Sequence, residues 1–238
     1  IQQKIVEILD KKCGQIDEIV RIEENEIEKL KEYKTSLITK VVTKGLDPNA
    51  KMKDSGIPWI GQIPDDWEVA KIKNVVEICN GKEVVDNDGE VLVYGSGGIF
   101  GKTSKIMYDN ESVLLGRKGT VDRPIYLKDI KFWCIDTMFY TKSKNLILMK
   151  LFYYIMFIFD YKPYIYGTAL PSMSQSILNE IYIPLAKNVV QQQIVEYLDK
   201  RCEEIDNLIK IKQEKIEKLK EYKKSLIYQY VTGKKEVV

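Results

Sequence analysis

Mostly apolar side chains recur at alternating steps of four and three residues near both ends of the chain. Neither segment contains proline, and Glu and Lys often stand four residues apart, which favours a helix. The alternating steps are the heptad seam of a coiled coil, so we predict two helices, over residues 2–43 and 191–232, each about 63 Å long. The first seam is Leu9, Cys13, Ile16, Val20, Glu23, Ile27, Leu30, Lys34, Leu37 and Val41, and the second is Leu198, Cys202, Ile205, Ile209, Lys212, Ile216, Leu219, Lys223, Leu226 and Tyr230.

The two helical segments are copies of one another. Residues 2–45 align with residues 191–234, and 25 of the 44 positions are identical. Such copies most simply pack antiparallel about a pseudo-twofold axis, which would bring Glu23 to Lys212, the one seam pair whose charge changes sign. A polar pair inside a seam can fix register and orientation. The alternative is that both side chains reach into solvent.

The repeat predicts three parts: a first long helix (1–45), a globular domain (46–188), and a second long helix with a tail (189–238). The fold class is α+β, a mixed domain flanked by two helices that form an antiparallel coiled coil. Asn145 is the expected N-cap of a helix ending at Phe159, and a short helix should begin near Ser174. Strand-like runs occupy residues 68–73, 91–94, 112–115, 125–127, 131–135, 138–141 and 181–185.

The same symmetry makes a prediction about the first helix. The second helix is entered from a domain whose last strand-like segment contains Ile183, Pro184 and Leu185. The first helix should be entered in the same way. A further globular domain is therefore expected before it in the intact protein, or from another subunit.

Composition removes several classes of site. The chain has no histidine, which excludes Ser-His-Asp and Cys-His triads, HExxH zinc sites and histidine general bases. Its four cysteines form no CxxC pair and are typical of the reduced thiols of a cytoplasmic protein. The longest apolar run, residues 151–159, is too short to cross a membrane. We predict no catalytic residues, metal or cofactor.

Charge is unevenly distributed within the central domain. The chain's net charge is only +2, yet residues 46–90 hold 5 basic and 10 acidic side chains, whereas residues 91–188 hold 12 basic and 7 acidic ones. This separation permits a one-sided basic surface, which would suit phosphates. A solvated polar face is the alternative.

Three glycine-containing loops are the best candidates for such a surface: residues 94–98, 116–120 and 167–172. Small residues let a ligand approach the backbone, and Arg or Lys among them can reach phosphates or base edges. Ordinary tight turns are the alternative. The main candidates for DNA binding are Arg117, Lys118 and Arg123, and the weaker ones are Ser96, Lys102, Thr120, Thr168 and Ser172.

Residues 94–103 also resemble a phosphate-binding P-loop. That motif requires glycine where Ser96 stands, and residues 104–111 read as a strand rather than the helix that should follow. An enzyme built on this loop would bind a nucleotide, and these two departures from the motif make that function the least favoured.

The order of motifs resembles the specificity subunit of type I restriction-modification systems. The matching segments are GIPWIGQIPDDWEV (56–69), LLGRKGTVDRPIY (114–126), LPSMSQSILNEIYIPL (170–185) and the two QQxIVExLD helices. The resemblance implies a target-recognition domain that binds one half of a bipartite target in double-stranded DNA, without catalysis of its own. It also implies that the helices act as a ruler and dock the methyltransferase (modification) subunits.

The resemblance implies further partners. The modification subunits would carry the methylation chemistry, and a separate ATP-driven restriction subunit would join the complex indirectly. The other half of the target would fall to an N-terminal recognition domain or to a second copy. A coiled-coil adaptor whose domain binds protein is the alternative, and it predicts no DNA affinity and no salt dependence.

Overall fold

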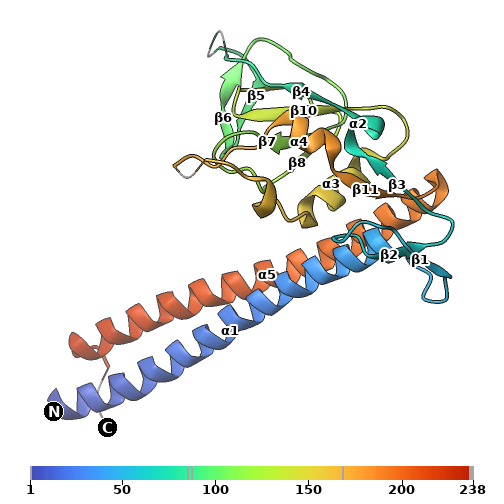
Figure 1. The fold of residues 1–238 in the computed structure, drawn as a ribbon. Helices are drawn as coiled ribbons and strands as arrows, with labels where there is room; N and C mark the ends of the chain where they lie inside the picture. The colour runs from blue at the N-terminus through green and yellow to red at the C-terminus, as the bar shows by residue number, and fades with distance from the viewer. Residues whose placement is uncertain (1, 85, 87, 168, 236–238) are drawn as a thin grey trace. The chain divides into compact units, whose positions relative to one another are not determined.

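The computed structural model describes residues 2–84, 86, 88–167 and 169–235 (Figure 1). The chain forms two compact units. The first, the helical unit, comprises Ile1–Leu37 and Asp199–Val238. The second comprises Ile38–Leu198, and we call it the recognition domain after the domain that the resemblance implies. Within the described residues, no helix is long and apolar enough to cross a membrane.

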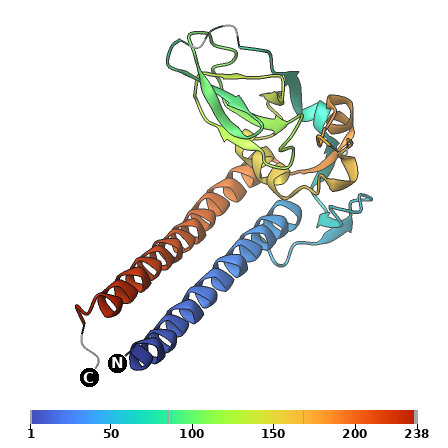
Figure 2. The same ribbon diagram turned by 90° about the vertical axis from the view of Figure 1, so that its left-hand side faces the viewer.

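Two long helices run in opposite directions through the helical unit: α1 (Gln2–Lys44) and α5 (Asn188–Val231) (Figures 1 and 2). The predicted seam is confirmed, because every one of its positions is buried or half-buried while the residues between them are mostly exposed. Ile16, Leu226 and Tyr230 form one buried group, with Val20 and Leu219 packed against it. Ion pairs that join Lys34 to Asp206 and Asp17 to Lys223 require the antiparallel arrangement.

The recognition domain is mostly strand. A four-stranded antiparallel sheet has the order β4-β10-β7-β8, and a three-stranded sheet, β6-β5-β9, contains the parallel pair β5 and β9. Two shorter sheets pair β1 with β2 and β11 with β3. The strands are β1 (Met52–Asp54), β2 (Gln62–Pro64), β3 (Glu68–Lys71), β4 (Val76–Asn80), β5 (Val91–Gly95), β6 (Gly98–Thr103), β7 (Ser112–Gly116), β8 (Ile125–Leu127), β9 (Phe132–Cys134), β10 (Met138–Ser143) and β11 (Tyr182–Leu185).

Buried strands and helices form the core of the recognition domain. Strand β7 is buried at all five positions, and Phe132, Cys134 and Met138 lie in the cluster beside it. This burial raises the pKa of the Cys134 thiol to about 12. The remaining helical elements are α2 (Ile72–Val75), α3 (Met149–Ile158), a 3-10 turn (Lys162–Tyr164) and α4 (Gln175–Glu180).

Most predicted strands are present, with local corrections. Strands β1, β2, β4 and β6 were not predicted, and residues 104–111 are not a strand, apart from a single bridge at Tyr108. Ser174 caps α4 as expected, since its hydroxyl accepts a hydrogen bond from the Ile177 amide. Asn145 is not the N-cap of α3: it adopts a left-handed conformation (φ 62°), and the helix begins at Met149.

A buried glutamine supports the start of α3. The Gln191 side chain accepts a hydrogen bond from the Leu148 amide at 2.8 Å and donates to the carbonyls of Leu146 and Ala186. Its side chain thus takes the first orphan amide of the helix, which a local cap would otherwise take. This contact gives a structural reason for the first glutamine of the second QQxIVExLD motif.

Candidate nucleic-acid interface

The three predicted loops converge on one edge of the recognition domain. The first is the end of the β5–β6 hairpin, where the Ser96 amide donates to the Thr137 hydroxyl at 3.3 Å. The second follows β7, where the amides of Arg117 and Lys118 donate to the Thr137 carbonyl at 2.8 and 3.2 Å. Thr137 lies immediately before β10, so one residue joins two loops that are distant in sequence.

The third loop is bound to the second by backbone hydrogen bonds. The Gly119 amide donates to the Pro171 carbonyl at 2.8 Å, and the Met173 amide donates to the Arg117 carbonyl at 2.9 Å. Within the third loop, Tyr166 and Ser172 exchange a pair of backbone bonds. We call the described parts of the three loops (residues 94–98, 116–120, 167 and 169–172), together with Tyr166, which pairs with Ser172, the three-loop cluster.

Glycine is required at the turn that carries the basic pair. A Cβ added at Gly116 would lie 2.3 Å from the Thr120 carbonyl oxygen and 2.5 Å from the Val121 Cα, and both of these are backbone atoms. Gly119 has a φ of 81°, in the left-handed region. The turn can therefore close tightly enough to place Arg117 and Lys118 side by side at the domain edge.

The two basic side chains share one acidic neighbour. Lys118 Nζ lies 3.5 Å from Asp136 Oδ2, and both side chains are about two-fifths exposed, so the pair is weak. Arg117 Nη1 donates to the Asp136 carbonyl at 3.4 Å, and its guanidinium lies 5.8 Å from the centre of the Phe139 ring. Among the residues that the structure describes, the cluster therefore presents the cations Arg117 and Lys118, of which only Lys118 faces a carboxylate.

A family model described as the type I restriction modification DNA specificity domain matches residues 64–221, more than half of the chain. The chain belongs to this family. Residues 64–221 include every loop of the three-loop cluster, so the specificity domain contains the surface described above.

Curated relatives agree with this assignment. The chain is 30% identical, over 98% of its length, to the type I restriction enzyme MjaVIII specificity subunit of Methanocaldococcus jannaschii, and 26% identical to the putative MjaX specificity subunit of the same organism. It spans 60% and 57% of those two proteins, and thus less than two thirds of the curated relatives it matches.

Solved structures share the fold. A chain from a study of complex assembly and conformational transition of the type I R-M system has a TM-score of 0.76 at 14% identity, covering 96% of this chain and 58% of that one. The HsdS subunit from Thermoanaerobacter tengcongensis has a TM-score of 0.59 at 16% identity, covering 96% of this chain and 57% of that one. At these identities the likeness establishes the specificity-domain fold alone.

The predicted DNA-binding residues that the structure describes fall into two groups, those inside the three-loop cluster and those outside it. Ser96, Arg117, Lys118, Thr120 and Ser172 lie in the three-loop cluster. Lys102 lies within β6 opposite Leu92 and pairs with Glu90 at 3.1 Å. Arg123 is exposed on the segment between β7 and β8. Thr168 lies outside the described residues.

The predicted separation of charge is partly cancelled in space. Basic residues of the second half of the domain pair with acidic residues of the first half: Lys102 with Glu90, Lys142 with Glu77 and Lys187 with Asp66. Two of these pairs join residues far apart in the chain, so charge counts over separate stretches of sequence do not reveal them. The basic character of the domain is therefore more local than the sequence indicated.

Two features of the edge were missed in the sequence. Asp136 and Thr137, which hold the loops, stand in no recognisable motif, because their role depends on which strands become neighbours. Ile99 and Phe100 follow the hairpin turn on β6 and are each 66% exposed. An apolar pair between glycines is a detectable signal, but these two residues follow the predicted loop 94–98 and belong to no predicted strand.

The helical unit carries a repeated apolar face. Ile19 and Ile22 on α1 are 40% and 44% exposed, and their repeat equivalents Leu208 and Ile211 on α5 are 48% and 60% exposed. These four residues, which we call the repeated face, lie outside the seam. The repeat therefore supplies two similar apolar patches, one on each helix.

Proposed function

We propose that this specificity domain binds duplex DNA sequence-specifically through the three-loop cluster and catalyses no reaction of its own. The observation that carries the proposal is the convergence of three loops, distant in sequence, around Arg117 and Lys118. A turn built on Gly116 and Gly119 lets the backbone approach a groove closely. Ligand-binding residues are commonly carried on loops held by a rigid scaffold, and here the backbone hydrogen bonds fix the loops.

The two cations suit different parts of DNA. Arg117 is oriented by its carbonyl contact and by the Phe139 ring, and a planar guanidinium can bind the O6 and N7 atoms of guanine with two hydrogen bonds. Within the described part of the chain, the Lys118 ammonium is held by a single 3.5 Å pair with a carboxylate that is about two-fifths exposed. It can exchange that partner for a phosphate at little cost. We assign base recognition to Arg117 and a phosphate contact to Lys118.

Binding titrations at several salt concentrations separate these roles. Arg117→Ala should cost about 1–3 kcal/mol on the preferred site and relax preference at one base pair, and Arg117→Lys should not restore that preference. Lys118→Ala should weaken binding to all sequences alike and flatten the salt slope by about one unit.

The matched control for these variants is Lys51→Ala with Lys187→Ala, because both side chains are exposed and hold only long ion pairs. The control should leave binding unchanged. Absence of DNA affinity and of salt dependence in the unmodified protein would favour the adaptor function instead.

Ile99 and Phe100 extend the same proposal. An exposed apolar pair beside a DNA-binding loop can contact a thymine methyl group or insert between base steps. Phe100→Ala should therefore reduce affinity for the preferred site without changing the salt slope, since no charge is removed. A flattened slope would contradict this role.

We further propose that the repeated face docks modification subunits, one on each helix, with the restriction subunit joining the complex through them. Two similar patches fit two copies of one partner. Ile22→Asp or Ile211→Asp alone should reduce the stoichiometry of co-purified modification subunits from two to one, and the double variant should abolish capture. A bipartite target would then need a second recognition domain, from the same polypeptide or from a second copy.

A further inference from the structure

Four charged side chains meet at the middle of the helical unit. Lys212 Nζ lies 3.0 Å from Glu23 Oε2 and also contacts Glu26, and Lys215 Nζ lies 2.5 Å from Glu23 Oε1. The Glu23 side chain is only 8% exposed. Hydrogen bonds from Lys215 and Lys212 lower the pKa of Glu23, so this carboxylate is held charged inside the seam. We call these four residues the central cluster.

The four residues of the central cluster occupy two pairs of equivalent positions in the repeat. Glu23 and Lys212 occupy equivalent positions of the two copies, and so do Glu26 and Lys215. The Lys212–Glu26 and Lys215–Glu23 contacts are therefore the same contact related by the pseudo-twofold axis. Both acids lie on α1 and both cations lie on α5, although 25 of the 44 aligned positions of the two copies are identical.

A second set of ion pairs behaves differently. Lys34 pairs with Asp206, and Asp17 pairs with Lys223, each at 2.7 Å or less. These pairs are also equivalent under the repeat, but each helix carries one Asp and one Lys. Any antiparallel pairing of the two kinds of helix, like with like or like with unlike, would keep them. They fix register and direction without regard to the identity of the partner.

We propose that the central cluster selects the partner helix: an α1-type helix accepts an α5-type helix, from its own chain or another, and rejects a second α1-type helix. Two α1-type helices in this register would place Glu23 against Glu23 and Glu26 of the partner. Two α5-type helices would oppose Lys212 and Lys215 in the same way. Like charges forced together at a nearly buried position exclude the wrong partner.

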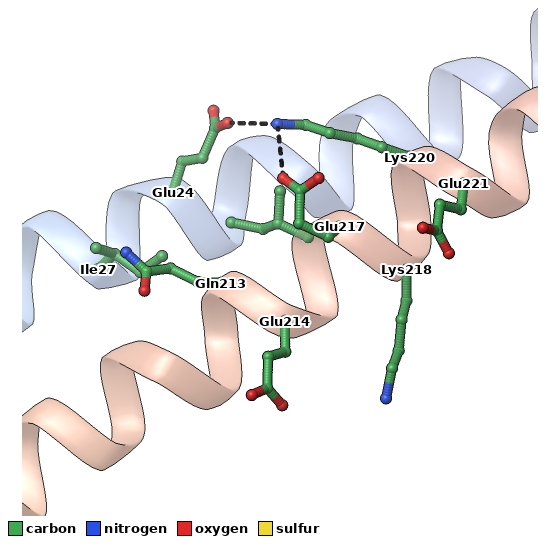
Figure 3. A pocket seen from close by; sticks show the side chains of 9 residues that line it. Glu24, Ile27, Gln213, Glu214, Glu217, Lys218, Lys220 and Glu221 are labelled. Atoms are coloured by element: carbon green, nitrogen blue, oxygen red, sulfur yellow. Dashed lines mark ion pairs between the residues drawn. The ribbon is translucent and has the colours of Figure 1, made fainter.

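One ion pair would favour the pairing of two α1-type helices. In the groove of about 710 Å³ lined by Glu24, Ile27 and Glu217, Lys220 lies 3.9 Å from Glu24 (Figure 3). The equivalent positions are Gln213 and Lys31, so two α1-type helices would form this pair twice. Both side chains are about half exposed, and such a pair contributes little. It does not offset the repulsion at the central cluster.

Charge reversal in the full chain tests the proposal. Lys212→Glu with Lys215→Glu gives α1 a partner with its own charges, and Glu23→Lys with Glu26→Lys does the same for α5. In thermal unfolding followed by the circular dichroism of the helices, each double variant should lower the midpoint temperature by about 5 °C or more. Combining all four changes should restore most of the loss, because the charges are again opposite.

Matched controls reverse the same number of charges on exposed positions: Lys210→Glu with Lys224→Glu, and Glu7→Lys with Glu32→Lys. These should shift the midpoint little. Raising salt to about 0.5 M should recover part of the midpoint in the double variants only, because repulsion is screened. Double variants that match their controls, or a fourfold variant that is no better than the doubles, would overturn the proposal.

Discussion

The helical unit and the three-loop cluster both contain basic side chains, but these side chains differ in how many acidic partners they have. In the helical unit, Lys34, Lys212, Lys215 and Lys223 each face a carboxylate of the opposite helix. In the three-loop cluster, Arg117 and Lys118 share the single residue Asp136. The helical charges are matched across an interface that the chain itself supplies.

This difference indicates where a ligand is still needed. A lysine held between two carboxylates gains nothing from a phosphate, whereas Lys118, with one weak and exposed partner, can exchange it. The net charge of the domain does not show where a ligand binds, because its basic and acidic side chains partly pair with one another. The number of partners that each cation already has is more informative.

The largest effect should come from the seam of the helical unit. Leu226 is 1% exposed and lies in the buried group with Ile16 and Tyr230. Leu226→Ala should lower the free energy of unfolding by about 2–5 kcal/mol, because it leaves a cavity among packed side chains. Leu208→Ala, at a position 48% exposed, is the control and should change it by no more than about 0.5 kcal/mol. Equal effects in a denaturant titration would show that the seam is assigned to the wrong face.

The next effect concerns the turn in the recognition domain. Gly116→Ala should cost about 1–3 kcal/mol, since its Cβ would overlap backbone atoms of Thr120 and Val121. Gly97→Ala is the matched control, because nothing lies within 4 Å of its Cβ. DNA affinity should fall in Gly116→Ala along with the stability of the turn, while the unfolding of the paired helices stays unchanged. If Gly116→Ala keeps its affinity for DNA, the tight turn is not needed for DNA binding and this prediction is wrong.

These two regions also differ in how far the sequence could predict them. The seam, the antiparallel direction and the meeting of Glu23 with Lys212 follow from a periodic pattern that is present twice, so local information is sufficient. The loops were identified by composition, but their convergence depends on the order of strands in two sheets. Thr137 joins two loops only because β10 lies beside β7, and no spacing in the sequence encodes that neighbour.

The errors have similar causes. Asn145 was predicted to cap a helix by its residue type, yet Gln191, which is distant in sequence, takes the amide at the helix start. Strand β6 lies outside every strand-like run predicted from the sequence, since glycine at positions 97, 98 and 101 weakens the local preference for a strand, although pairing with β5 holds it extended. In each case a tertiary contact outweighed the local preference.

The smallest effect should be a pH dependence of stability that arises from Glu180, a carboxylate of the recognition domain that is paired with two lysines. Lys71 and Lys73 lower the pKa of Glu180 from 4.5 to about 2. Because the folded-state pKa is the lower one, the contribution of Glu180 to stability is present above about pH 4.5 and is lost as the pH falls towards 2. Glu180→Gln should flatten the fall in thermal midpoint across that window, so that the midpoints of the variant and the unmodified protein differ most above pH 4.5 and least near pH 2. An unchanged slope would contradict this assignment.

The most direct test of the account is site-specific DNA methylation by the complex assembled with cognate modification subunits. We predict that Arg117→Ala with Lys118→Ala abolishes or relaxes methylation at the site assigned to this domain, whereas Lys51→Ala with Lys187→Ala leaves it unchanged. Assembly of the complex, followed by its mass, should be the same for both pairs of changes. Unchanged sequence-specific methylation by the Arg117/Lys118 variant, in a complex of normal mass, would contradict the claim that the three-loop cluster recognises DNA.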